Sequence, residues 1–184
     1  MVNIYLIRHG ETDYNVKGII QGSLDTPINE NGVKQALDAM DEISMLDIDM
    51  ILSSPQKRAR MTSDIISSNL DMDYEIWNEF KERSFGIYQG KSYKYLRENL
   101  TEDYYKSKRD FYHRTENGES MEDVYERVKS AFEKIKNKWD GKNILIVSHG
   151  STVRIIDAYF RLEKGQVDFD IHMENCKIYH YVIK

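Results

Sequence analysis

The segment Val2-Asn3-Ile4-Tyr5-Leu6-Ile7-Arg8-His9-Gly10 is an apolar run that ends in an arginine, a histidine and a glycine. Its β-branched and aromatic residues favour a buried strand, and its polar ending favours a functional loop. A second run, Asn143-Ile144-Leu145-Ile146-Val147, is followed in the same way by Ser148-His149-Gly150. We therefore expect two buried strands that each present a histidine at the carboxyl end.

Further apolar runs and periodic segments surround these two strands. Shorter strands are expected at Asp49–Leu52, Asp73–Trp77 and Lys177–Ile183. Apolar residues at spacings of three and four predict helices over Asn29–Met45, Pro55–Leu70 and Ser120–Trp139, with a short helix after Gly150. Pro55 is expected in a first helical turn after a serine cap, and Ser120 is expected to cap the helix that it opens.

The alternation of strands with helices decides the fold class. Parallel strands need crossover connections, which are usually helices, and these helices cover both faces of the sheet. We therefore predict an α/β fold, a three-layer αβα sandwich with a mostly parallel central sheet. The 184 residues suit one domain of this kind, so a single domain over residues 1–184 is expected.

Composition limits the location and the partners of the chain. Apolar residues make up 40% and charged residues 31%, as in soluble globular proteins, and the net charge of −5 argues against a general nucleic-acid binder. Cys176 is the only cysteine, which favours a reducing compartment. Neither a secretory leader nor an apolar run of about 20 residues stands out. We expect a cytoplasmic protein without a membrane partner, either a monomer or a homodimer.

Five side chains that can act on a phosphate group follow predicted strands or begin a predicted helix. His9 and His149 lie at the strand ends where active sites of parallel sheets are found. Arg8 offers a planar fork of donors that matches a phosphate, and Arg58 lies in a first helical turn, where free amides favour anions. Glu82 lies in a loop. The five side chains could converge on a single tetrahedral dianion.

Two other interpretations of these residues compete with this one. A single arginine–histidine pair is more often structural than functional, so the pair Arg8-His9 alone carries little weight. Two histidines and a carboxylate are also a common zinc-binding set. Arg8 and Arg58 argue against zinc, because they would repel a divalent cation from the place where an anion should bind. We therefore predict neither a metal nor another cofactor.

With these residues in this order, the chain resembles the histidine phosphatase superfamily, which is also called phosphoglycerate mutase-like, and in particular its small bacterial phosphatases. The resemblance covers about Ile4 to Val153. It rests on Leu6-Ile7-Arg8-His9-Gly10-Glu11-Thr12, Asn15, Gln21-Gly22, Asp25-Thr26-Pro27-Ile28, Ser53-Ser54-Pro55, Arg58-Ala59, Thr62, Glu82, Phe85-Gly86, Gly118-Glu119-Ser120 and Ser148-His149-Gly150.

The resemblance implies a role for each of the five side chains. His9 would attack phosphorus and become a transient phosphohistidine. Arg8, Arg58 and His149 would surround the phosphoryl oxygens and stabilise their charge. Glu82 would protonate the leaving alkoxide and then take a proton from the attacking water.

The resemblance also implies residues that hold the substrate around this centre. Contacts to the phosphate or the rest of the substrate are expected from Asn15, Gln21, Gly22 and Gly150. The Tyr- and Lys-rich segment 88–114 would form a cap or insertion over the active site. Between Lys91 and Arg114 it carries seven Lys/Arg against four Asp/Glu, a surplus of three positive charges. Glu119 and Ser120 are expected to serve in local capping rather than in chemistry.

Three functions fit this resemblance. The first is hydrolysis of a small phosphorylated metabolite through phosphohistidine, without a metal. The second is a cofactor-dependent phosphoglycerate mutase, which passes the phosphoryl group to a second substrate hydroxyl; the shortness of this chain favours hydrolysis over this one. The third is an inactive domain that binds a phosphorylated ligand, which would have no need for Glu82. The sequence does not choose the leaving group.

Overall fold

A central sheet carries the site. The computed structural model describes residues 1–99, 101–168 and 171–184. In this part of the chain, the strands of the sheet have the order β3-β2-β4-β1-β5. The strands are β1 (Val2–Arg8), β2 (Met50–Ser53), β3 (Tyr74–Ile76), β4 (Asn143–Ser148) and β5 (Ile178–Ile183). β5 is antiparallel to β1, and the other pairs are parallel, which confirms the mostly parallel sheet.

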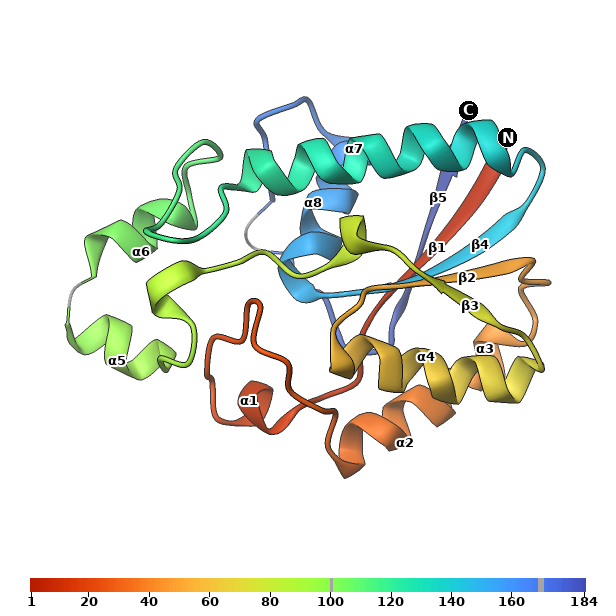
Figure 1. Ribbon diagram of the computed structural model, residues 1–184, viewed down its shortest axis with the longest axis horizontal. Helices are drawn as coiled ribbons and strands as arrows, with labels where there is room; N and C mark the ends of the chain where they lie inside the picture. The colour runs from red at the N-terminus through yellow and green to blue at the C-terminus, as the bar shows by residue number, and fades with distance from the viewer. Residues whose placement is uncertain (100, 169–170) are drawn as a thin grey trace.

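Helices cover both faces of this sheet, as the predicted three-layer sandwich requires (Figure 1). One face packs against α2 (Glu30–Asp38), α3 (Met40–Ile43) and α4 (Lys57–Leu70), and the other against α7 (Met121–Lys138) and α8 (Gly150–Arg161). The short elements are α1 (Asp13–Val16), the 3₁₀ turns η1 (Asn78–Phe80) and η2 (Gly86–Tyr88), α5 (Tyr93–Glu98) and α6 (Glu102–Ser107).

The core is divided between the two faces by the alternation of side chains along each strand. In β4, Ile144 and Ile146 belong to the cluster under α7 and α8, and Leu145 and Val147 to the cluster under α3 and α4. All four are fully buried. A strand that is apolar on both faces can only be central, so its carboxyl end lies in the middle of the sheet edge.

Two details of the predicted helices are wrong. The helix predicted over Asn29–Met45 is divided at Ala39, where ψ is −17° and the backbone tightens towards a 3₁₀ turn. Pro55 does not lie in the first turn of α4, and no serine caps that helix. Gln56 is the N-cap residue, in extended conformation, and its side chain makes no cap hydrogen bond. The reason is that this side chain is used by the site described below.

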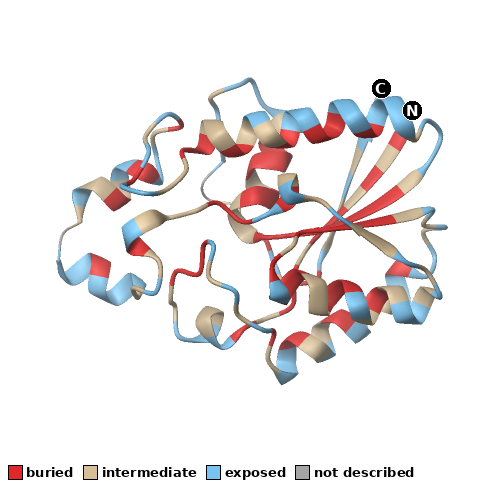
Figure 2. Ribbon diagram, in the orientation of Figure 1, coloured by how far each residue is buried: buried red, intermediate tan, exposed pale blue. Residues whose placement is uncertain are grey.

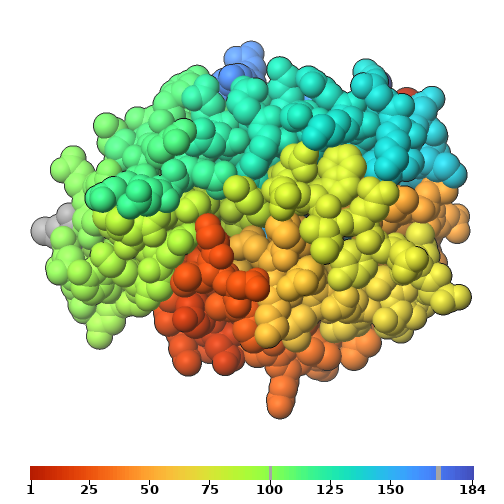
Figure 3. Space-filling view, viewed as in Figure 1, coloured from red at the N-terminus to blue at the C-terminus, as the bar shows by residue number. Residues whose placement is uncertain are grey.

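The segment predicted as a cap contains α5 and α6 and has an apolar cluster of its own. Tyr88, Leu96 and Tyr104 pack with Ile20 of the N-terminal loop. Backbone hydrogen bonds join the same two segments, among them the one from Tyr93 N to Gly18 O at 2.9 Å. The segments are in contact in the space-filling view, and α5 is largely exposed (Figures 2 and 3). That the segment acts as a cap stays a prediction.

Candidate active site

The carboxyl ends of three parallel strands bring the predicted site residues together. Arg8 of β1 pairs in register with Ser148 of β4, and Val147 of β4 with Ser53 of β2. The loops that follow these strands therefore start side by side, at the edge where ligands of open parallel sheets bind.

A cavity of about 500 Å³ opens at this edge. Eight of the nine predicted site residues line it: Arg8, His9, Asn15, Gln21, Gly22, Arg58, Glu82 and Gly150. The ninth, His149, does not line the cavity. It is fully buried, and the centre of its ring lies 5.1 Å from that of His9.

The hydrogen bonds of His9 fix the form of its imidazole. Its Nδ1 lies 2.7 Å from the carbonyl oxygen of Gly10, an acceptor, so Nδ1 carries the proton. Its Nε2 accepts a hydrogen bond of 3.2 Å from Nε of Arg58. Burial, then the positive charges of Arg58 and Arg8, lower the pKa of His9 well below its ordinary value. His9 is therefore a neutral imidazole with its lone pair on Nε2.

Arg58 is held between the two histidines. Its Nε is also 3.1 Å from Nδ1 of His149, and its Nη2 donates to Gly22 O at 2.9 Å. Nε2 of His149 lies 2.6 Å from Oγ of Ser54. Burial, then the charge of Arg58, lower the pKa of His149 well below its ordinary value. Burial lowers the pKa of Arg58 to about 10, so this side chain stays positively charged at neutral pH.

Arg8 is the second cation of the cavity. Its Nη1 donates to the carbonyl of Met173 at 2.9 Å, and its Nε is buried without a hydrogen-bond partner among the described residues. A Cβ atom at position 150 would lie 3.5 Å from this Nε. Gly150 therefore leaves space directly beside the guanidinium of Arg8, which is where an anion would need to approach.

The two predicted amide side chains are turned so that their donors remain for a ligand. Oδ1 of Asn15 accepts from the backbone N–H of Thr12 at 3.1 Å, which completes the capping box of α1. Oε1 of Gln21 accepts from the hydroxyl of Thr26. With both carbonyl oxygens satisfied inside the protein, each side chain has its NH₂ group left to donate, as binding of an anion requires.

Glu82 caps the first turn of α8 with its carboxylate. Oε2 accepts from the backbone N–H of Ser151 at 3.1 Å. Oε1 accepts from the N–H and the hydroxyl of Thr152, both at 3.2 Å, and from the N–H of Arg83 at 2.8 Å. The helix that follows His149 thus positions the carboxylate at the cavity wall, because its free N–H groups need an acceptor there.

The side chain of Gln56 joins this carboxylate to the rest of the site. Its Oε1 accepts from the backbone N–H of Glu82 at 2.7 Å, and its Nε2 donates to the carbonyl of Gly22 at 2.7 Å. Gly22 has a φ of +50°, which favours glycine, and a Cβ there would lie 2.1 Å from Oε1 of Gln89, so this side chain would have to move. Gln56 therefore positions two loops at once, which explains why it does not cap α4.

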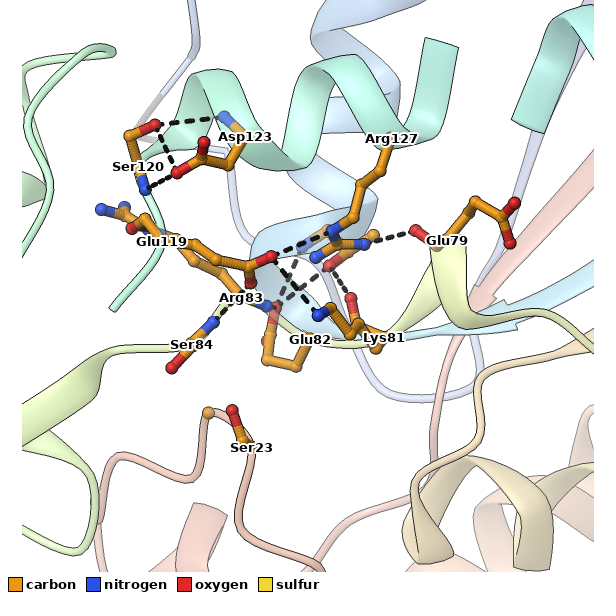
Figure 4. A network of polar contacts seen from close by, with 12 residues as sticks. Ser23, Glu79, Lys81, Glu82, Arg83, Ser84, Glu119, Ser120, Asp123 and Arg127 are labelled. Carbon is orange, nitrogen blue, oxygen red and sulfur yellow. Dashed lines mark hydrogen bonds and ion pairs between the residues drawn. The ribbon is translucent and has the colours of Figure 1, made fainter. Parts of the chain in front are cut away.

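A network of charged groups around Glu119 holds the loop that carries Glu82 (Figure 4). Oε2 of Glu119 accepts from the backbone N–H of Ser84 at 2.9 Å, and its Oε1 lies 3.4 Å from Nε of Arg127 and 3.6 Å from Nζ of Lys81. Its carbonyl accepts from Nε of Arg83 at 2.8 Å. Glu119 thus binds the loop on both sides of Glu82.

The prediction of local capping for Glu119 is therefore wrong, whereas that for Ser120 is confirmed. Ser120 and Asp123 form a capping box at the start of α7, with hydrogen bonds of 3.1 Å and 2.7 Å. Glu119 makes no cap contact because its carboxylate is taken up by the loop of Glu82 and by Arg127.

Several residues that complete the site were not predicted from the sequence. Ser54 and Gln56 follow a buried strand, and this position could have indicated them. Arg154 also lines the cavity, four residues after Gly150 on α8, and this helical spacing was a usable signal. Tyr93 contributes from α5 and belongs to the Tyr- and Lys-rich segment 88–114, whose composition pointed to the segment and not to this residue. Within the described residues, no group of three or more His, Cys, Asp or Glu side chains could hold a metal ion.

The chain is similar to known proteins over most of its length. Residues 4–184 match the model of the histidine phosphatase superfamily (branch 1). The chain is 30% identical to an uncharacterized phosphatase, PhoE, of Bacillus subtilis (strain 168), over 85% of this chain and 76% of that protein.

Two solved structures are similar along the whole chain. A mutant phosphoserine phosphatase from Entamoeba histolytica, in complex with phosphoserine, has a TM-score of 0.84 and 26% identity. The YhfR structure from Bacillus stearothermophilus has a TM-score of 0.92 and 23% identity, which shows the shared fold. Each match covers 100% of this chain and 92% of the other. None of the described helices is both long and apolar enough to cross a membrane.

Proposed function

The chain belongs to the histidine phosphatase superfamily, branch 1, and on this premise we propose that it hydrolyses small phosphomonoesters through a phosphohistidine at His9. The observation that carries the proposal is the state of His9. A neutral imidazole, with its proton on Nδ1 and its lone pair on Nε2, lies in a cavity lined by Arg8 and Arg58. A lone pair beside two guanidinium groups can attack the phosphorus of a bound dianion.

In the first step, Nε2 of His9 gives up its hydrogen bond from Nε of Arg58 and forms a bond to phosphorus, while the bond from phosphorus to the ester oxygen breaks. Arg8 and Arg58 stabilise the charge on the phosphoryl oxygens, and the amides of Asn15 and Gln21 add neutral donors. Glu82 gives a proton to the departing oxygen. Among the described residues, its Oε2 accepts one hydrogen bond, from Ser151, which leaves a lone pair to carry this proton.

In the second step, water attacks phosphorus and the bond to Nε2 breaks. The carboxylate of Glu82 takes a proton from this water, and inorganic phosphate leaves with His9 regenerated. The four donors that contact Glu82 stabilise the carboxylate between the two steps. No step needs a metal or a cofactor.

His149 acts in this scheme by orienting Arg58. Its Nδ1 accepts from Nε of Arg58, so its Nε2 carries the proton that is directed at Ser54. In this position His149 keeps Nε of Arg58 directed at the two histidine rings, and it reaches the phosphate through Arg58 rather than directly. The segment 88–114 is proposed to cover the cavity, since Tyr93 already lines it.

The test is turnover of p-nitrophenyl phosphate by the purified chain, with EDTA present, in wild type and in the His9→Ala variant. We expect release of phosphate by the wild type and none by the variant. Equal activity in both would overturn the role of His9, and complete loss of wild-type activity in EDTA would overturn the metal-free scheme. Adding 3-phosphoglycerate with 2,3-bisphosphoglycerate tests the acceptor, because a mutase would form 2-phosphoglycerate faster than inorganic phosphate.

A further inference from the structure

The peptide bond between Gly10 and Glu11 connects the proposed nucleophile to helix α2. Its carbonyl oxygen accepts from Nδ1 of His9 at 2.7 Å. Its N–H donates to Oε1 of Gln35 at 2.9 Å. A peptide bond is planar, with the carbonyl and the N–H on opposite sides, so a hydrogen bond at one end fixes the direction of the other. The side chain of Gln35 therefore sets where the acceptor of His9 points.

A glycine directly after a nucleophile would leave the chain free to turn, and the packing of α2 removes this freedom. A Cβ atom on Gly32 would lie 2.7 Å from N of Glu11 and 2.9 Å from the carbonyl carbon of Gly10, so the helix backbone lies directly against this peptide. Gly32 and Gln35 are three residues apart and share one face of α2. That face holds the peptide both by contact and by a hydrogen bond.

The preceding peptide, between His9 and Gly10, is also held at both ends. Nδ2 of Asn175 donates to its carbonyl at 2.6 Å, and its N–H donates to Oγ1 of Thr62 at 3.0 Å. Thr62 is fully buried. With this plane fixed, the acceptor of His9 can change direction only by rotation at Gly10, and the hydrogen bond to Gln35 opposes that rotation.

The acceptor of Nδ1 becomes more important during phosphoryl transfer. In the unreacted site the ring of His9 is held at both nitrogens, by Gly10 and by Arg58. When Nε2 forms the bond to phosphorus, the contact with Arg58 is given up and Nδ1 keeps its proton. The ring then carries a positive charge, and a hydrogen bond from a charged donor is about twice as strong as a neutral one. The carbonyl of Gly10 thus stabilises the phosphohistidine more than the free imidazole.

We propose that Gln35 is a positioning residue for phosphorylation of His9. The role rests on the proposed phosphatase function. Gln35 acts through the peptide of Gly10 and Glu11 without touching the substrate, since it does not line the cavity. Its amide oxygen also polarises that peptide, because hydrogen bonds in a chain strengthen one another. Gln35 therefore favours the phosphorylated form of His9 over the free form.

Two substitutions at this position separate the acceptor from the rest of the side chain. Gln35→Met removes the acceptor and nearly keeps the length, and Gln35→Glu keeps an acceptor. We expect kcat/KM of Gln35→Met to fall about 5- to 30-fold, the range of one lost hydrogen bond. The fall should be equal for an alkyl phosphate and for 2,4-dinitrophenyl phosphate, because both need the same attack by His9. Gln35→Glu should recover most of the loss.

Binding of inorganic phosphate gives the complementary measurement. Arg8 and Arg58 hold phosphate without help from Gln35, so the inhibition constant of phosphate should change by less than about twofold in Gln35→Met. The matched control is Lys34→Met, because Lys34 is exposed on α2 and pairs with Asp38 at 2.6 Å, so kcat/KM should not change. Unchanged kcat/KM in Gln35→Met, or weakening of phosphate binding by the same factor, would overturn the role.

Proton NMR makes the test independent of turnover. The ring of His9 is buried, so the proton on Nδ1 should give a low-field signal that is missing in His9→Ala. In Gln35→Met this proton should exchange with water faster, because its acceptor is no longer held, and in Gln35→Glu it should not. An unchanged signal in Gln35→Met would overturn the role of Gln35 whatever the rate.

The two measurements together separate the two proposals. If the wild type hydrolyses no phosphomonoester but the NMR signal responds as expected, Gln35 positions His9 and the phosphatase function fails. If the wild type forms phosphohistidine, and Gln35→Met leaves both the rate and the signal unchanged, the phosphatase function stands and the role of Gln35 fails.

Discussion

Replacing Glu82 with glutamine separates its chemical role from its structural one. The carboxylate accepts four hydrogen bonds from Arg83, Ser151 and Thr152. In Glu82→Gln, the carbonyl oxygen can keep the three hydrogen bonds that reach Oε1. The new NH₂ group, however, faces the N–H of Ser151, and two donors cannot form a hydrogen bond. One lost hydrogen bond at a helix N-terminus should lower the free energy of unfolding by about 1–3 kcal/mol.

The kinetic effect should depend on the leaving group. For a phenethyl or other alkyl phosphate, the departing alkoxide needs the proton of Glu82, so kcat/KM should fall by about 10²–10⁴-fold. For 2,4-dinitrophenyl phosphate, the leaving group departs without a proton, so kcat/KM should fall by less than about tenfold. Hydrolysis of the phosphoenzyme still needs the base, so kcat for this substrate should fall while KM falls with it.

The assay is steady-state kinetics of both substrates with wild type and Glu82→Gln, together with urea unfolding of both proteins. Arg161→Met serves as the matched control, because Arg161 lies outside the cavity and should leave both substrates unaffected. An equal loss of kcat/KM for the two substrates would refute the role of Glu82 as the acid. It would mean that the carboxylate acts only by holding the start of α8.

Three further predictions concern other parts of the structure. Gly10→Ala should lower the free energy of unfolding by more than about 2 kcal/mol in urea titrations, because its Cβ would lie 2.4 Å from the carbonyl oxygen of Gly32. A change below about 0.5 kcal/mol would contradict this and show that the two loops separate easily. The lowered pKa of His149 means that, below its ordinary value of 6.5, the unfolded chain binds a proton that the folded chain does not. The free energy of unfolding should therefore have its full value above pH 6.5 and fall below it, by up to about 1.4 kcal/mol per pH unit for this histidine. In His149→Phe, the free energy of unfolding should fall less per pH unit. An equal fall in wild type and variant would contradict the buried neutral form of His149. Glu119→Gln weakens the contacts with Arg127 and Lys81 that hold the loop of Glu82. It should therefore lower kcat/KM for alkyl phosphates, which need the acid, more than for 2,4-dinitrophenyl phosphate. An equal loss for both substrates would instead indicate a general packing defect.

The sheet and the histidine positions were predictable because they depend on local patterns. The run before Arg8 and the run before Ser148 are mostly apolar, which predicted two buried strands, and paired parallel strands place their carboxyl ends together. The position of Arg58 followed from the strand and helix start that surround it. Eight of the nine predicted site residues consequently line one cavity.

The contacts between loops were not predictable from such patterns. Gln56 joins the loops of Gly22 and Glu82, and nothing near it in the sequence specifies either partner. Glu119 looked like part of a helix cap because it precedes Ser120, but its carboxylate binds the backbone of Ser84, 35 residues away. That His149 surrounds the phosphate stays a prediction, and its hydrogen bond with Arg58 joins two residues that lie 91 positions apart.

The division of the helix at Ala39 was also not predictable from the sequence pattern. The apolar spacing continues across it, since Ala36 and Ile43 are both buried, so the pattern alone indicates one helix. A single ψ of −17° turns the chain slightly without changing which face is buried. Such a change alters backbone geometry and leaves the hydrophobic period intact.

Phosphorylation of His9 is the most direct test of the proposed mechanism. Glu82→Gln with 2,4-dinitrophenyl phosphate should form the phosphoenzyme rapidly and hydrolyse it slowly, because the first step does not need the acid and the second step needs the base. Rapid mixing should give a burst of about one equivalent of dinitrophenol per chain, and mass spectrometry of the alkali-quenched protein should find one phosphoryl group on the peptide that contains His9. His9→Ala should give neither. A burst without phosphate on His9, or phosphate on another residue, would contradict the mechanism.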